Sequence, residues 1–162
     1  MDRPEDLFEK WYVQPLERLR EIPNGAGGFV ALATCCFLYE RYAVAVIEKS
    51  GHNADTSAII SQFATDFGVD KETAQNFWDV IRNGLLHGGM PKQQEYGQQT
   101  LPYWAMREDF PAVELSEWCG KRILKVQPWQ IMEKVISLWR ENLHLLDRSK
   151  SFPWANILPL PF

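Results

Sequence analysis

The stretch from Phe29 to Ile47 is the most apolar part of this chain, and it is nearly long enough to cross a bilayer as a helix. Glu40 and Arg41, however, stand side by side near its centre, where a lipid environment makes charge costly. A helix that is apolar almost all round is typical of a central element covered on several sides. The stretch therefore predicts a buried helix from Gly28 to about Ser50 in a soluble protein.

Four further segments have apolar residues at helical spacing. They cover approximately residues 8–22, 56–67, 71–87 and 128–146. Asp55 and Asp70 stand where the N-caps of the second and third of these helices are expected, and Gly68 can end the second. Pro15 must kink or restart the first helix, because it has no backbone N–H to donate four residues back.

Residues 100–126 and the C-terminal tail follow different patterns. Two short strand patterns, at 112–116 and 122–126, flank Glu117-Trp118-Cys119-Gly120 and predict a hairpin. Residues 151–162 carry no charge and three prolines, which favours an extended tail docked on the protein. We therefore expect a mainly α fold, a bundle of about five helices with a small β-hairpin insertion at about 100–126. Residues 1–150 would form one domain, followed by the apolar tail.

The composition and charge limit the kinds of function that this chain can have. Hydrophobic residues at 46% and charged residues at 23% are typical of a globular chain, and the net charge of −4 argues against a nonspecific polyanion binder. The charge is uneven, because residues 1–118 carry 10 basic and 18 acidic side chains while residues 119–162 carry 7 and 3. Lys121 and Arg122 belong to this basic part and are candidates for contacting a phosphate backbone. A solvated charged face explains the same pattern.

The three cysteines form neither a disulfide framework nor a metal site. Cys35 and Cys36 are adjacent, Cys119 stands alone, and no Cys/His ligand spacing occurs. We expect reduced thiols, a cytoplasmic location, and no metal or other cofactor.

The candidate catalytic residues lie in the segment Ile81-Arg82-Asn83-Gly84-Leu85-Leu86-His87. A helical wheel places Arg82, Asn83, Leu86 and His87 on the arc away from the helix's own core, facing solvent or another chain. Asn83 and His87 are four residues apart, so the amide can orient the imidazole. The alternative is structural, with Arg82 paired to Asp79 and His87 ending the helix.

Arg82-Asn83-x-x-x-His87 at a helix end, in a bundle with a long apolar earlier helix, resembles the HEPN superfamily. The resemblance covers roughly residues 5–90 and the last helix. It implies a metal-independent endoribonuclease, usually a homodimer that brings two Arg/His pairs together. It also matches Glu40 to an acidic residue used near the pair, although a structural ion pair with Arg41 explains Glu40 equally well. Gly89 stands where toxin–antitoxin members often carry Tyr, so the chain departs from that subtype.

The resemblance implies that the ribose 2′-OH attacks the adjacent phosphorus and leaves a 2′,3′-cyclic phosphate and a 5′-OH. In this scheme His87 is the general acid or base, Arg82 holds the phosphate, Asn83 orients His87 or binds the phosphate, and Glu40 positions Arg82. The candidates for binding the RNA are Arg41, Tyr39, Lys121 and Arg122. The role expected is a bacterial toxin or anti-phage effector, which leaves open an antitoxin or other regulatory partner. A noncatalytic dimeric interaction module or nucleotide-binding module is the alternative.

Overall fold

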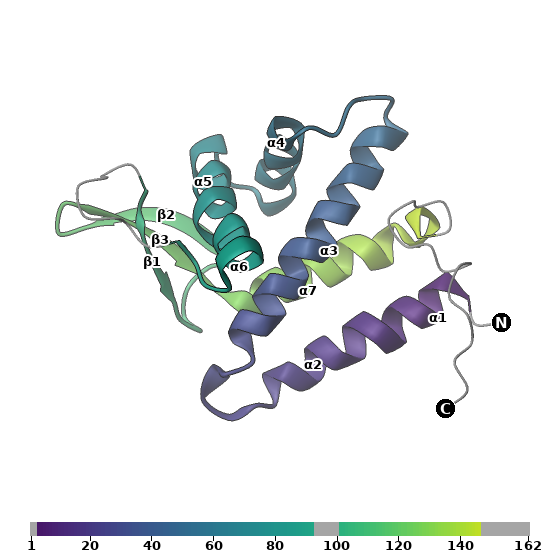
Figure 1. Ribbon diagram of the computed structural model, residues 1–162, viewed down its shortest axis with the longest axis horizontal. Coiled ribbons are helices and arrows are strands. Elements are labelled where there is room, and N and C mark those ends of the chain that lie inside the picture. Colours follow the sequence, from purple (N-terminus) through teal and green to yellow (C-terminus); the bar gives the residue numbers. More distant parts are fainter. Residues whose placement is uncertain (1–2, 93–100, 147–162) are drawn as a thin grey trace.

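The centre of the molecule is helix α3 (Gly28–Lys49), as the apolar stretch predicts. The structure, a computed structural model, describes residues 3–92 and 101–146. The other helices are α1 (Pro4–Phe8), α2 (Gln14–Arg20), α4 (Thr56–Phe67), α5 (Lys71–Asn76), α6 (Asn83–Gly88) and α7 (Pro128–Glu141). In Figure 1, α1 and α2 lie on one side of α3, α4 to α6 lie on the other, and α7 crosses behind. Helix α3 thus contacts α2, α4, α6 and α7.

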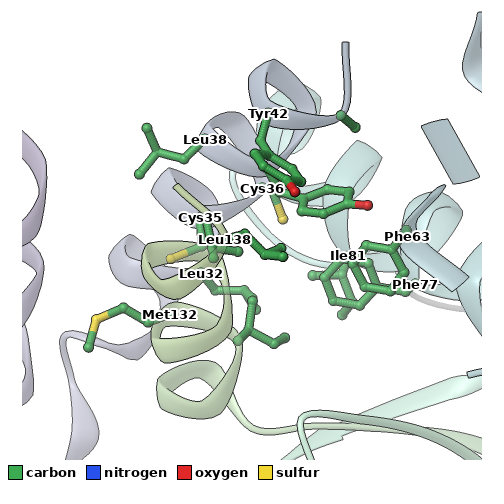
Figure 2. Close-up of a cluster of buried hydrophobic side chains, with 14 of the residues drawn as sticks. Leu32, Cys35, Cys36, Leu38, Tyr42, Phe63, Phe77, Ile81, Met132 and Leu138 are labelled. Carbon is green, nitrogen blue, oxygen red and sulfur yellow. The ribbon is translucent and has the colours of Figure 1, made fainter. Parts of the chain in front are cut away.

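By length and composition alone, α3 is a candidate membrane span, and half of its most apolar window is buried inside the protein. The core helix of a soluble protein meets the same criteria of length and composition. The buried side chains of α3 include Leu32, Cys35, Cys36 and Leu38 (Figure 2), and the Leu38 carbonyl accepts a hydrogen bond of 3.1 Å from the indole N–H of Trp139 on α7.

The predicted irregularity at Pro15 takes the form of a wide helical turn. A π-helical segment, Glu9–Val13, joins α1 to α2, and the Gln14 N–H donates to the Glu9 carbonyl five residues back. The wider turn accommodates a proline, because the ring of Pro15 would clash with the carbonyl four residues back in a regular α-helix. The chain therefore continues as one rod through the proline (Figure 1).

Aspartate side chains cap the N-termini of α4 and α5, as predicted. Asp55 accepts a 2.8 Å hydrogen bond from the Ala58 N–H and begins α4, which ends at Gly68 in the left-handed conformation. Asp70 accepts a 2.7 Å bond from the Thr73 N–H and begins α5, and this bond lowers the pKa of the Asp70 carboxyl. The ring of Phe63 on α4 stacks on that of Phe77, the residue that follows α5, with centroids 4.7 Å apart (Figure 2).

The last helix begins at Pro128 as predicted, but it ends earlier than expected. Helix α7 stops at Glu141, and a 3-10 segment, Leu143–Leu145, continues the chain. The expected inward residues are buried, namely Ile131, Val135, Leu138 and Leu145. A further 3-10 segment, Pro23–Gly25, connects α2 to α3.

Residues 103–126 form a three-stranded sheet rather than the predicted hairpin alone. Strands β2 (Val113–Trp118) and β3 (Lys121–Val126) form the predicted antiparallel hairpin, with positive φ at both Cys119 and Gly120 in a tight turn. Strand β1 (Tyr103–Met106) adds to β3 in parallel, giving the order β1-β3-β2. Sequence reasoning missed β1 because four residues are too few to show a clear alternation.

The fold is therefore mainly helical with a small sheet, which confirms the predicted class at that level. The predicted C-terminal tail, residues 151–162, lies outside the described residues. All three cysteines are free thiols, and burial raises the pKa of Cys35 to about 12 and that of Cys36 further.

Candidate functional site

The helix that carries Arg82 and His87 contains a second wide turn. A π-helical segment, Phe77–Arg82, joins α5 to α6, and the Asn83 N–H donates to the Trp78 carbonyl five residues back. The Val80 carbonyl, inside this turn, accepts a 2.8 Å bond from the N–H of Lys92 on the returning chain. Such turns often occur at functional sites, because they shift side chains out of the regular helical spacing.

Gly84 allows the returning chain to lie against the helix just after this turn. A Cβ added at Gly84 would lie 2.5 Å from the Lys92 nitrogen and 2.6 Å from the Met90 carbonyl oxygen, both of which are backbone atoms. Gly89, in the left-handed conformation, ends α6 and reverses the chain. The returning segment and Gly84 together fix the helix end that holds Arg82 and His87.

The Arg82 guanidinium forms the centre of the site. Its Nη2 and Nε donate to the same carboxylate oxygen of Glu40 on α3, at 2.6 and 3.2 Å. The guanidinium carbon also lies 5.2 Å from the ring centroid of Trp78 on the same helix. The side chains of Arg82 and Glu40 are only 17% and 27% exposed. The ion pair and the ring therefore hold Arg82 in one orientation.

One edge of the Arg82 guanidinium contacts Glu40, and Asn83 and His87 lie at the opposite edge. Arg82 Nη1 donates to Asn83 Oδ1 at 2.8 Å and lies 3.4 Å from His87 Nε2. When Arg82 donates to Nε2, the imidazole is neutral and carries its proton on Nδ1. His87 is exposed. The group thus presents a fixed cation and a solvent-accessible imidazole side by side.

Several sequence expectations about this group are corrected. The structure shows no hydrogen bond between Asn83 and His87, and the Asn83 amide oxygen accepts from Arg82. The alternative pairing of Arg82 with Asp79 is wrong, since the carboxylate paired with Arg82 is that of Glu40. The Arg82 side chain reaches Glu40 on α3 instead of pointing wholly outward, and only 17% of it is exposed. Leu86 and His87 do face outward.

Two proposed binding residues on α3 lie apart from this group. Tyr39 is buried and donates to Asp66 Oδ2 on α4 at 2.9 Å, where burial raises the pKa of both the Tyr39 phenol and the Asp66 carboxyl. Arg41 is exposed, with its guanidinium 5.5 Å from the ring centroid of Phe37, and it does not pair with Glu40. The structural interpretation of Glu40 and Arg41 as an ion pair is therefore wrong.

The two basic strand residues also lie apart from it. Arg122 donates to Glu72 in the first turn of α5, and the Lys121 ammonium lies 5.2 Å from the ring centroid of Tyr103. Arg82 comes ten residues after Glu72, about 15 Å along the helix at 1.5 Å per residue. The structure thus places Lys121 and Arg122 in a second region, on the sheet.

Sequence reasoning missed two features that shape the site. Trp78 precedes Arg82 by four residues, a spacing that predicts contact on a helix, but the aromatic ring fitted the core stripe equally well. Gly84 gave no signal, since a glycine within a helix can have many causes.

No known family model, curated protein or solved structure matches this chain. Among residues 3–92 and 101–146, no group of three or more His, Cys, Asp or Glu side chains could hold a metal ion.

Replacing Glu40 with alanine will destabilise the protein by about 1–2 kcal/mol. The loss leaves the mostly buried Arg82 charge without its carboxylate, which costs more than breaking an exposed pair and less than breaking a fully buried one. Urea denaturation measures the change. The matched control is Glu9→Ala, which breaks the more exposed pair with Arg140 and should cost less than about 1 kcal/mol. Equal losses for the two variants would contradict this description of the site.

Proposed function

We propose that this chain is a metal-independent endoribonuclease of the HEPN type. One observation carries the proposal, namely the Arg82 guanidinium held by Glu40 within 3.4 Å of the exposed His87 imidazole. Arginine binds phosphate through a planar fork of N–H donors, and histidine transfers protons near neutral pH. A cation fixed beside a proton-transfer group suits phosphodiester chemistry on RNA.

The proposed reaction uses the RNA's own hydroxyl as the nucleophile. The 2′ oxygen attacks the adjacent phosphorus, the bond from phosphorus to the 5′ oxygen breaks, and a 2′,3′-cyclic phosphate and a 5′-OH result. His87 Nε2, once released from Arg82, accepts the proton of the 2′-OH, or a protonated His87 donates one to the departing 5′ oxygen; water or the second His87 of a dimer serves the other oxygen. Arg82 stabilises negative charge on the phosphoryl oxygens. Glu40 and Asn83 act through Arg82, by holding its guanidinium in place.

The biological setting is a further part of the proposal. We place the protein in the cytoplasm, where RNA is the substrate and thiols stay reduced. A bacterial toxin or anti-phage effector fits an endoribonuclease of this size. Such an enzyme needs control, so an antitoxin or other regulatory partner belongs to the same proposal.

His87→Ala will lower the rate of RNA cleavage by at least about 100-fold, because it removes the proton-transfer group. Labelled RNA incubated with the protein in EDTA provides the measurement, with cleavage by the unmodified protein expected to persist. The control is His52→Ala, which removes an exposed histidine in the loop after α3 and should leave the rate unchanged. Cleavage that requires a divalent metal would contradict the mechanism. No cleavage by any variant would favour the noncatalytic alternative, a dimeric interaction module or nucleotide-binding module.

We also propose that the chain acts as a homodimer with a shared site. Helix α3 keeps an outward apolar stripe, in which Val30 is 57% exposed and Phe37 and Val44 are half-buried at seven-residue spacing. Leu86, one residue before His87, is 38% exposed. A two-fold axis beside α6 would cover Leu86 and bring two Arg82/His87 pairs into one cleft.

Leu86→Glu will convert the dimer to a monomer and reduce RNA cleavage, since two buried carboxylates would face each other across the axis. Light scattering reports the mass, and the cleavage assay reports activity in the same samples. Ile22→Glu serves as the control, because Ile22 is 41% exposed but follows α2 and belongs neither to α6 nor to the apolar stripe of α3. The shared-site proposal would be contradicted if the wild-type protein were a fully active monomer, or if monomeric Leu86→Glu kept full cleavage activity.

A further inference from the structure

The sheet has one face toward the helices and one face outward. Alternation along the strands points one set of side chains inward, and it comprises Val113, Leu115, Leu124, Val126, Trp104 and Met106, all buried or half-buried. The outward set centres on Tyr103, Trp118 and Lys121, with Ile123 and Lys125 continuing it along β3. Figure 1 shows the sheet at one end of the molecule, with the β2–β3 turn reaching furthest out.

Two aromatic rings stand exposed on this outward face. Trp118 is 67% exposed and Tyr103 is 45% exposed. Lys121 lies between them, directly opposite Trp118 in the hairpin register and with its ammonium 5.2 Å from the Tyr103 ring centroid. The tight turn at Cys119 and Gly120 follows Trp118 directly and fixes the ends of both strands. Exposed rings on a rigid framework are a feature of binding surfaces.

The charge on this face differs from that of the whole chain. Among the described strand residues on this face, Lys121 and Lys125 stand against one carboxylate, that of Glu114, which pairs with Lys125 at 2.8 Å, so Lys121 is the strand cation beside the rings. The chain as a whole has a net charge of −4. Aromatic rings interleaved with a lysine complement a single nucleic-acid strand, whose bases stack on rings and whose phosphates attract cations.

We propose that the outward face of the sheet binds single-stranded RNA, with bases stacked on Trp118 and Tyr103 and a phosphate held by Lys121. The selection of RNA rests on the proposed function, whereas the single-stranded form follows from the rings, because the bases of a duplex are already stacked on each other. Arg122 ties β3 to Glu72 at the start of α5, and Arg82 lies about 15 Å further along that helix. The sheet would thus anchor the substrate away from the cleavage group.

Binding is measured in His87→Ala protein, so that the RNA stays intact, by anisotropy of a labelled single strand of about twelve nucleotides. Adding Trp118→Ala or Tyr103→Ala should weaken the affinity at least about fivefold, since each removes a stacking ring. Adding Lys121→Ala should reduce the slope of log affinity against log salt by about 0.7. Trp11→Ala is the control, because Trp11 is 42% exposed on the rod of α1 and α2. Circular dichroism checks that every variant is folded.

Three results would overturn this assignment. These are unchanged affinity in Trp118→Ala, competition by duplex RNA as strong as that by the single strand, and loss of dimer mass in Trp118→Ala without any change in RNA affinity. The last of these would identify the face as a protein interface. Because cleavage plays no part in this assay, a protein that binds the single strand through Trp118 but never cuts RNA would support the sheet site and count against the proposed enzyme alone.

Discussion

The ion pair between Glu40 and Arg82 connects the central helix to the helix that carries the candidate site. Both side chains lie mostly out of solvent, where an unpaired charge is costly and a paired one is fixed in orientation. The pair therefore has two effects. It places a charge inside α3 that the apolar stretch alone would not tolerate, and it directs the remaining guanidinium edge toward Asn83 and His87.

The backbone supports this arrangement through two departures from regular helix. A wide turn, Phe77–Arg82, ends at Arg82 itself, and the returning chain bonds to the Val80 carbonyl within that turn. Gly84 makes the return possible, since any Cβ there would meet backbone atoms. A similar wide turn at Glu9–Val13 accommodates Pro15. The same type of turn therefore keeps the first helix continuous and, in the later helix, ends at the candidate site.

Much of the helical and hairpin structure follows from local sequence patterns. The apolar helix, the Asp55 and Asp70 caps and the hairpin around residues 117–120 each depend on a few neighbouring residues, and each was predicted, although the turn is tighter than expected. The contact of Glu40 with Arg82 was expected only through the family resemblance, because the two residues lie far apart in the chain. The contacts of Asn83, Tyr39 and Arg122 were not predicted, since wide turns and long-range pairings leave no periodic signal in the sequence.

We propose that the group of Arg82, Asn83 and His87 directs the RNA's 2′ oxygen onto the neighbouring phosphorus. The decisive experiment is mass spectrometry of the cleavage products, together with an RNA carrying a 2′-O-methyl group at the cleaved position. We expect a 2′,3′-cyclic phosphate on one fragment, a 5′-hydroxyl on the other, and no cleavage at the methylated nucleotide. Fragments ending in a 5′-phosphate and a 3′-hydroxyl, or cutting at the methylated nucleotide, would contradict it, because neither can arise from attack by a 2′ oxygen.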